Sequence, residues 1–191
     1  MRLDASVDEQ HGFQLRMCER YGKPILNVAS HDDPAMLGER FDAVNLDATV
    51  KFDSGASTAE VKNFVHGDAM AMPADWAGRF ATVVLGEYLE HCDLDVAVTT
   101  LKECARVCRP DGVIVVTFPL DDRPKEEQHT EPDKFYWVNP GFSSWHRTVW
   151  TDPMLEDLFR RAGLVEVSRA DLLYPLTKVV PGWGIVLRKA G

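Results

Sequence analysis

The sequence has no long apolar run that could cross a membrane. Its longest apolar stretches, such as residues 113–116, have the length of a strand. Residues 1–17 contain no apolar segment of the kind found in signal peptides. We therefore expect a protein that stays in the cytoplasm and has no membrane partner.

Positive charge is also scarce. Lys and Arg together number 21 against 30 Asp and Glu, which gives a formal net charge of -9 at pH 7. A negative surface repels phosphate backbones, and no run or stripe of basic residues offsets it. Nucleic acid is therefore not an expected partner.

The four cysteines include no Cys-x-x-Cys pair, and we expect reduced thiols in this setting. Cys104 and Cys108 lie four residues apart on a predicted helix, where His91 could join them around a metal. Both fall on the apolar face of that helix, and their spacing does not suit a metal centre. The sequence predicts core cysteines and no metal site.

Glycine is missing from a turn where nucleotide-binding folds normally have it. Residues 23–47 have the pattern of a buried strand, a tight turn, a helix starting at Asp33-Pro34 and a second strand ending at Asp47. This is the layout of a nucleotide-binding βαβ unit, but residues 29–33 contain no glycine. The absence of G-x-G-x-x-G argues against a nicotinamide-dependent oxidoreductase.

Strand-length apolar runs alternate with helical periodicity along the chain, which predicts a single α/β domain over residues 1–191. The expected helices cover residues 10–21, 33–40, 93–108 and 152–162. The expected strands cover residues 25–29, 41–47, 63–66, 80–85, 113–118, 164–169 and 183–189, with a turn at 109–112.

Residues 120–150 contain several prolines and aromatic residues but no regular period. A connection of this length inside a compact domain is usually a lid or a binding loop. We therefore expect a lid or substrate loop here. Its aromatic side chains fit either a substrate pocket or a small core that holds the connection down.

Five fragments resemble, in order, the class I S-adenosylmethionine-dependent methyltransferases, and together they span nearly the whole chain. They are ILNVA at 25–29, NLD at 45–47, GDAMAMP at 67–73, FATVVLGEYLEH at 80–91 and LKECARVCRPDGVIVVTFP at 101–119. The resemblance implies a Rossmann-like three-layer αβα sandwich with a mostly parallel seven-stranded sheet and an antiparallel last strand. It also implies S-adenosylmethionine as cofactor and methyl transfer to a small-molecule acceptor.

The resemblance places cofactor-binding residues at the ends of strands. Asp47 is expected to accept hydrogen bonds from both ribose hydroxyls and Asp68 from the adenine amino group. The amide of Ala69 or Met70 is expected to donate to a ring nitrogen. The full expected cofactor site is Ala29, Ser30, His31, Asp47, Ala48, Asp68, Ala69, Met70, Leu85 and Gly86.

In similar sequences, glycines that permit positive φ stand at the positions of Ala29, His31 and Asp33. Alanine is tolerated here if its φ stays negative, whereas the other two residues add side chains beside the methionine end of the cofactor. One hypothesis is a variant cradle, in which amides after Asp33 face the methionine carboxylate and Asp32 or Asp33 faces its ammonium. The alternative is an occluded site in a catalytically inactive binding or regulatory module.

Methyl transfer from a sulfonium needs mainly alignment of the acceptor and exclusion of water. A general base is needed only if the acceptor is protonated. His91 is the candidate catalytic base, with His129 and His146 as alternatives, and the plain interpretation of each is a packing or surface histidine. The expected substrate-binding residues are Glu87, Tyr88, Trp145 and His146.

Overall fold

The computed structural model describes residues 9–29, 40–48, 62–120, 148, 150–175 and 179–191. These residues form a seven-stranded sheet with the strand order β3-β2-β1-β4-β5-β7-β6. Neighbouring strands are parallel, except that β7 runs antiparallel to both β5 and β6. The expected mostly parallel sheet with an antiparallel last strand is confirmed.

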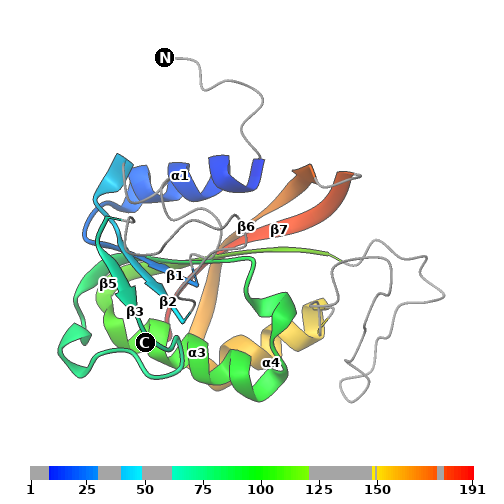
Figure 1. Cartoon of the computed structure of the whole chain (residues 1–191). Coiled ribbons are helices and arrows are strands. Elements are labelled where there is room, and N and C mark those ends of the chain that lie inside the picture. Colours follow the sequence, from blue (N-terminus) through cyan, green and yellow to red (C-terminus); the bar gives the residue numbers. More distant parts are fainter. Residues whose placement is uncertain (1–8, 30–39, 49–61, 121–147, 149, 176–178) are drawn as a thin grey trace.

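The strands are β1 Ile25–Val28, β2 Val44–Asp47, β3 Phe64–His66, β4 Phe80–Gly86, β5 Cys108–Pro119, β6 Leu164–Pro175 and β7 Val179–Lys189. The helices are α1 Glu9–Tyr21, α3 Leu94–Val107 and α4 Asp152–Ala162, with short 3-10 helices η2 Ala74–Trp76 and η3 Leu89–His91. Helix α1 covers one face of the sheet, and α3 and α4 cover the other (Figure 1). The result is the expected three-layer sandwich.

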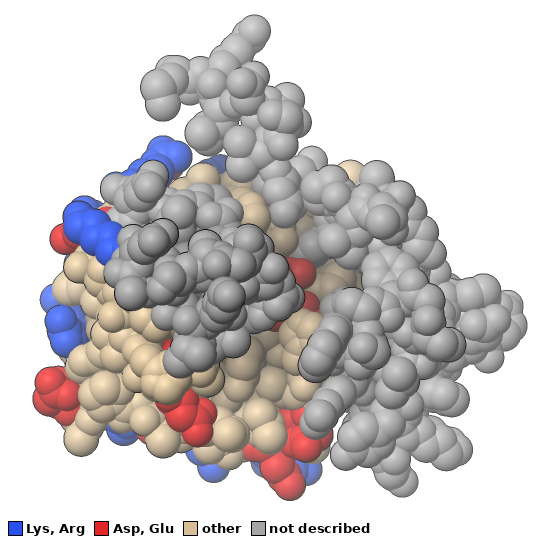
Figure 2. All heavy atoms as spheres, in the orientation of Figure 1, with Lys and Arg blue, Asp and Glu red and all other residues tan. Residues whose placement is uncertain are grey.

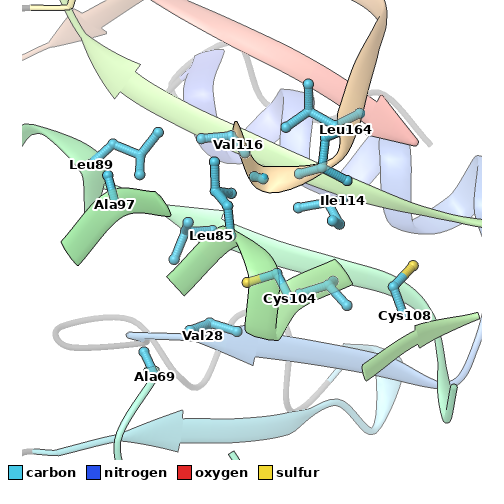
Figure 3. Close-up of a cluster of buried hydrophobic side chains, with 14 of the residues drawn as sticks. Val28, Ala69, Leu85, Leu89, Ala97, Cys104, Cys108, Ile114, Val116 and Leu164 are labelled. Carbon is cyan, nitrogen blue, oxygen red and sulfur yellow. The ribbon is translucent and has the colours of Figure 1, made fainter. Parts of the chain in front are cut away.

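Strand β5 shows why the centre of the sheet is apolar on both faces. Val113 and Val115 pack in the cluster beneath α1, whereas Ile114 and Val116 pack in the cluster that includes α3 and α4. Figure 3 shows Ile114 and Val116 in this second cluster, close to α3. A parallel strand covered on both faces needs such a continuous apolar run.

All four cysteines are buried and free, so the prediction of core cysteines is confirmed. Burial raises the pKa of the Cys108 thiol to about 11, which keeps it protonated at neutral pH. Among the described residues there is no group of side chains that could hold a metal ion. Within the same part of the chain, no helix is long and apolar enough to cross a membrane.

The start of the second strand differs from the prediction. Arg40 and Phe41 are helical, Asp42 has a φ of 58°, and β2 begins only at Val44. The side chain of Phe41 packs in the cluster beneath α1. An apolar residue next to a short strand fits both a helical and an extended pattern, which explains the wrong boundary.

The turn predicted at residues 109–112 is instead a bulge within β5. The register with β4 changes from Phe80 opposite Cys108 to Thr82 opposite Val113, so the extra residues loop out of the ladder. A Cβ on Gly112 would lie 2.7 Å from both the Ala81 carbonyl oxygen and the Cys108 Sγ. Glycine is therefore required where the bulge folds against β4.

The last two strands are longer than predicted. They pair from Leu164 opposite Lys189 to Pro175 opposite Val179, with a shift of register between Glu166 and Ser168. Leu173, in the part of β6 beyond the predicted strand, is 49% exposed. The ends of this hairpin are maintained by pairing between its two strands as well as by burial, and the hydrophobic pattern therefore underestimates their length.

Candidate cofactor and acceptor site

The carboxyl ends of β1, β2, β3 and β4 lie at one edge of the sheet because the four strands are parallel. The register places Val28 beside both Leu46 and Leu85. Figure 2 shows acidic side chains near the centre of the view and both acidic and basic side chains around its rim. The structure thus brings the described members of the predicted cofactor site to one edge.

Ala29, the first residue after β1, has a left-handed backbone with a φ of 53°. Its N–H donates to the Leu46 carbonyl at 2.8 Å, which ties the beginning of the turn to β2. The condition under which alanine would cost little here, a negative φ, is therefore not met. Alanine in this region is strained by about 1 to 2 kcal/mol, and such strain concentrates at functional sites. The chain therefore adopts, without glycine, the backbone conformation that glycine would favour.

Replacing Ala29 with Gly should relieve this strain. We expect the free energy of unfolding to rise by about 0.5 to 1 kcal/mol, because the relief slightly exceeds the added entropy of glycine in the unfolded chain. Affinity for S-adenosylhomocysteine should change less than about twofold, which corresponds to under half a kcal/mol. Denaturant titration and calorimetry measure the two quantities.

Ala77 provides the matched control, because it is exposed and has a φ of -52°. Ala77→Gly should lower the free energy of unfolding by about 0.5 to 1 kcal/mol. Equal destabilisation by the two substitutions would contradict a strained Ala29.

Asp47 ends β2 and is only 8% exposed. Its backbone carbonyl accepts a hydrogen bond from the Gly67 N–H at 2.9 Å, so the turn after β3 begins beside it. A Cβ on Gly67 would lie 2.8 Å from the Leu46 Cδ1, which explains the glycine. Beyond Asp47, the Ala48 carbonyl oxygen lies 2.9 Å from the His66 Nε2, a hydrogen-bond distance.

The turn at Asp68 is closed by its own hydrogen bonds. The Met70 N–H donates to the Asp68 Oδ1 at 2.8 Å, and the Ala71 N–H donates to the Asp68 carbonyl at 3.1 Å. The side chain thus forms an Asx turn. Because the Met70 amide is used within the turn, Ala69 is the better candidate of the two amides predicted to meet adenine.

Helix α3 holds this turn in place through Glu103 and Arg106. The Glu103 Oε2 accepts from the Met72 N–H at 2.9 Å, and the Arg106 Nη2 donates to the Met72 carbonyl at 2.9 Å. The two side chains also pair at 2.7 Å, and the hydrogen bond from Arg106 lowers the pKa of Glu103. The sequence prediction missed this contact, although it links the fragments 67–73 and 101–119.

Arg106→Met should release the turn from α3. We expect a loss of about 1 to 2 kcal/mol in the free energy of unfolding, because Glu103 and the Met72 carbonyl lose a charged donor. S-adenosylhomocysteine affinity should also fall. Lys102→Met, at an exposed position of the same helix, is the control and should change stability by less than about 0.5 kcal/mol. Denaturant titration measures these changes, and equal effects of the two variants would contradict the role of Arg106.

At the end of β4, the side chain of Leu85 is fully buried in the core, so only its backbone could contact a cofactor. Gly86 follows, and a Cβ there would lie 2.4 Å from the Gln14 Nε2 of α1. This Nε2 donates to the Thr117 Oγ1 at 2.8 Å. Helix α1 therefore reaches the site. The only indication of this in the sequence is Gln14, a polar residue between two apolar ones.

The predicted substrate residues Glu87 and Tyr88 lie directly beyond β4. Glu87 has a φ of 51°, and its N–H donates to the Thr117 carbonyl at 2.9 Å. The Tyr88 hydroxyl lies 3.4 Å from the Thr100 Oγ1 of α3. Burial raises the pKa of Tyr88 to about 12, so its hydroxyl stays neutral.

Glu90 and His91 lie in η3 and have opposite environments. Glu90 is 2% exposed, and neither of its carboxyl oxygens has a hydrogen-bond partner in the described part of the chain. Burial raises the pKa of Glu90 to about 8, so the group is mainly neutral at pH 7. The His91 side chain is 37% exposed, with its Nε2 4.0 Å from the Glu90 Oε1.

Several predicted residues lie outside the described residues. They are Ser30, His31, His129, Trp145 and His146, together with the helix start at Asp33-Pro34 and most of the loop at 120–150. Trp150, from the aromatic set of that loop, is 3% exposed within the main core. This residue therefore belongs to the main hydrophobic core, and the choice between a substrate pocket and a small core stays open for the other aromatic residues of the loop.

The sheet order, with acidic residues after two neighbouring parallel strands, defines a Rossmann-like fold of the class I S-adenosylmethionine-dependent methyltransferases. A family model described as a methyltransferase domain matches residues 17–116. The chain belongs to this methyltransferase-domain family, and its cofactor is S-adenosylmethionine. A search of curated proteins found no match to the sequence.

Solved structures with the same fold are distant in sequence. The chain is similar to a 1,6-didemethyltoxoflavin-N1-methyltransferase of Burkholderia thailandensis, with a TM-score of 0.70 and 17% identity over 98% of this chain and 82% of that one. It is similar to the YcgJ protein of Bacillus subtilis, with a TM-score of 0.70 and 15% identity over 96% and 99%. The [4+2]-cyclase SpnF has a TM-score of 0.66 and 14% identity over 94% and 81%. At these identities the likeness establishes the fold.

Proposed function

We propose that the protein transfers the methyl group of S-adenosylmethionine to a small-molecule acceptor in the cytoplasm. The observation that carries the proposal is the backbone of Ala29, which is left-handed without glycine and hydrogen-bonded to β2. This first position of the turn therefore supports the variant cradle. In that cradle, the backbones of Ala29 and Gly86 flank the methionine end of the cofactor.

The other contacts follow from the strand ends. Asp47, nearly buried at the end of β2, accepts from the ribose hydroxyls. Asp68 accepts from the adenine amino group, and the Ala69 amide donates to a ring nitrogen. The remaining predicted positions, Ala48, Met70 and Leu85, contribute apolar surface or backbone at the same edge.

The overall charge supports a small acceptor that is neutral or cationic. The net charge of -9 disfavours phosphate-rich partners. The Burkholderia thailandensis methyltransferase was solved with bound 1,6-didemethyltoxoflavin and S-adenosylhomocysteine, and it has the same fold. The acceptor would lie beyond β4, against Glu87 and Tyr88.

A second candidate is a catalytically inactive module that keeps the fold and binds a partner. The observation that favours it is the sequence Ala29-Ser30-His31-Asp32-Asp33, which places side chains where similar proteins have glycine. The similar fold of a [4+2]-cyclase also shows that this architecture serves another activity.

Transfer of a labelled methyl group separates these candidates. The protein is incubated with methyl-labelled S-adenosylmethionine, below saturation, and a cell extract divided by size, and Asp47→Ala serves as the control with weakened cofactor binding. The proposal predicts that the parent protein transfers more label to acceptors in the small-molecule fraction than Asp47→Ala does. Label confined to macromolecules would contradict the small acceptor, and no label in either fraction would favour the inactive module.

A further inference from the structure

Glu87 has a backbone conformation that long side chains rarely adopt. Its φ of 51° lies in the left-handed region, although the residue is neither glycine nor asparagine. Such strain persists only where neighbouring contacts enforce it, and it clusters at sites of function. Glu87 is half-buried and is the first residue after β4, so the strain occurs at the edge that carries the cofactor residues.

One hydrogen bond holds the backbone of Glu87, and a second supports the residue that accepts it. Its N–H donates to the Thr117 carbonyl of β5 at 2.9 Å, and the Thr117 hydroxyl accepts from the Gln14 Nε2 at 2.8 Å. Gln14 is 5% exposed and Thr117 is fully buried. The preceding Gly86 leaves no room for a side chain, because a Cβ would meet the Gln14 amide at 2.4 Å. Helix α1, strand β4 and strand β5 therefore meet around the backbone of Gly86 and Glu87.

The register places this backbone beside the expected methionine end of the cofactor. Val28 pairs with Leu85, so Ala29 and Gly86 are the next residues of adjacent parallel strands. Glu87 lies one residue further on. The alternative base, His91, belongs to η3 four residues later.

We propose that Glu87 is the catalytic residue that takes the acceptor's proton, and that Gln14 and Thr117 position it. The inference rests on the proposed methyl transfer. The acceptor, an N–H or O–H nucleophile, attacks the methyl carbon as the carbon–sulfur bond breaks and its electron pair returns to sulfur. The proton passes to the Glu87 carboxylate, leaving S-adenosylhomocysteine, the methylated product and a neutral Glu87.

This placement can be tested without knowing the acceptor. A carboxylate near the sulfonium favours the charged S-adenosylmethionine over the uncharged sulfur of S-adenosylhomocysteine. Glu87→Gln should therefore reduce the ratio of the two affinities by roughly three- to tenfold, as measured by calorimetry with both ligands. Glu156→Gln, an exposed substitution that changes net charge equally, should leave the ratio unchanged.

The possible outcomes distinguish the proposed role of Glu87 from the proposed methyl transfer. Binding by the parent with an unchanged ratio in Glu87→Gln would overturn the role of Glu87 alone. Failure of the parent to bind either ligand would overturn the proposed function and this inference together. Once an acceptor is identified, Glu87→Gln should lower kcat at least tenfold, within the range attributed to general base catalysis, and an unchanged kcat would remove Glu87 from the reaction.

Further variants distinguish a catalytic carboxylate from a structural one. Glu87→Gly should raise the melting temperature by about 2 to 4 °C, because glycine relieves the left-handed strain, while losing the same preference for S-adenosylmethionine. Thr117→Val removes the hydroxyl that Gln14 binds and should reduce the preference, whereas Thr117→Ser should retain it. Loss of stability in Thr117→Val without a change in the preference would contradict the positioning role.

Discussion

Asp47→Ala should weaken S-adenosylmethionine binding by about 1.5 to 3 kcal/mol, the usual contribution of hydrogen bonds to a charged group. This is a loss of roughly 10- to 150-fold in affinity. Asp47 is nearly buried at the end of β2, and its backbone carbonyl accepts a hydrogen bond from the Gly67 N–H. The substitution removes the carboxylate without removing that backbone contact.

Isothermal titration calorimetry with the folded variant measures this effect. Asp75→Ala, at an exposed position of η2, is the control and should bind like the parent. An unchanged affinity in a folded Asp47→Ala would exclude Asp47 from the site. A matching loss for S-adenosylhomocysteine is also expected, because the ribose is common to both ligands.

Glu90→Gln should change how stability depends on pH. Burial raises the pKa of Glu90 to about 8 from its ordinary value of 4.5. Between these values the unfolded chain ionises while the folded protein keeps its proton, so the free energy of unfolding falls as pH rises. The contribution of Glu90 to stability is fully present below the pKa that the group has in the unfolded chain. It is lost as the pH rises through the pKa that the group has in the folded protein.

The glutamine variant cannot titrate at this position, so its free energy of unfolding should not show this decrease with rising pH. Between pH 5 and pH 8 we expect the parent to lose about 2 to 4 kcal/mol more than Glu90→Gln. Urea denaturation at intervals across this range gives the comparison. His91→Gln is the control, because it removes the imidazole beside Glu90 and leaves the carboxyl in place. Identical pH profiles for parent and Glu90→Gln would show that the carboxyl is not held neutral by burial.

Much of the fold was predictable because burial on both faces determines its central strands. The apolar run at 113–116 and the periodic apolar positions of α3 specify a buried strand and a one-sided helix, and both are confirmed. The errors occur where strand pairing or side-chain packing, and not the local hydrophobic pattern, determines the backbone structure. The hydrophobic pattern contains no signal for the bulge at 109–112 or for the hairpin register of β6 and β7.

The candidate site was predictable where it depends on strand ends and only partly where it depends on backbone angles. The family resemblance places Asp47 and Asp68 at strand ends, and the structure has both there, while their contacts with a cofactor stay a prediction. The positive φ of Ala29 and Glu87 could not be predicted, because neither residue type favours that region. The contacts of Gln14 with Thr117 and of Arg106 with Met72 join distant segments, so local patterns could not identify them.

The central claim is that a turn without glycine still binds the cofactor. Calorimetric titration of the purified parent protein with S-adenosylhomocysteine tests it most directly. The account predicts saturable binding to one site per chain, weakened in Asp47→Ala and nearly unchanged in Ala29→Gly. A parent protein that gives no heat of binding at millimolar ligand, while remaining folded, would contradict it.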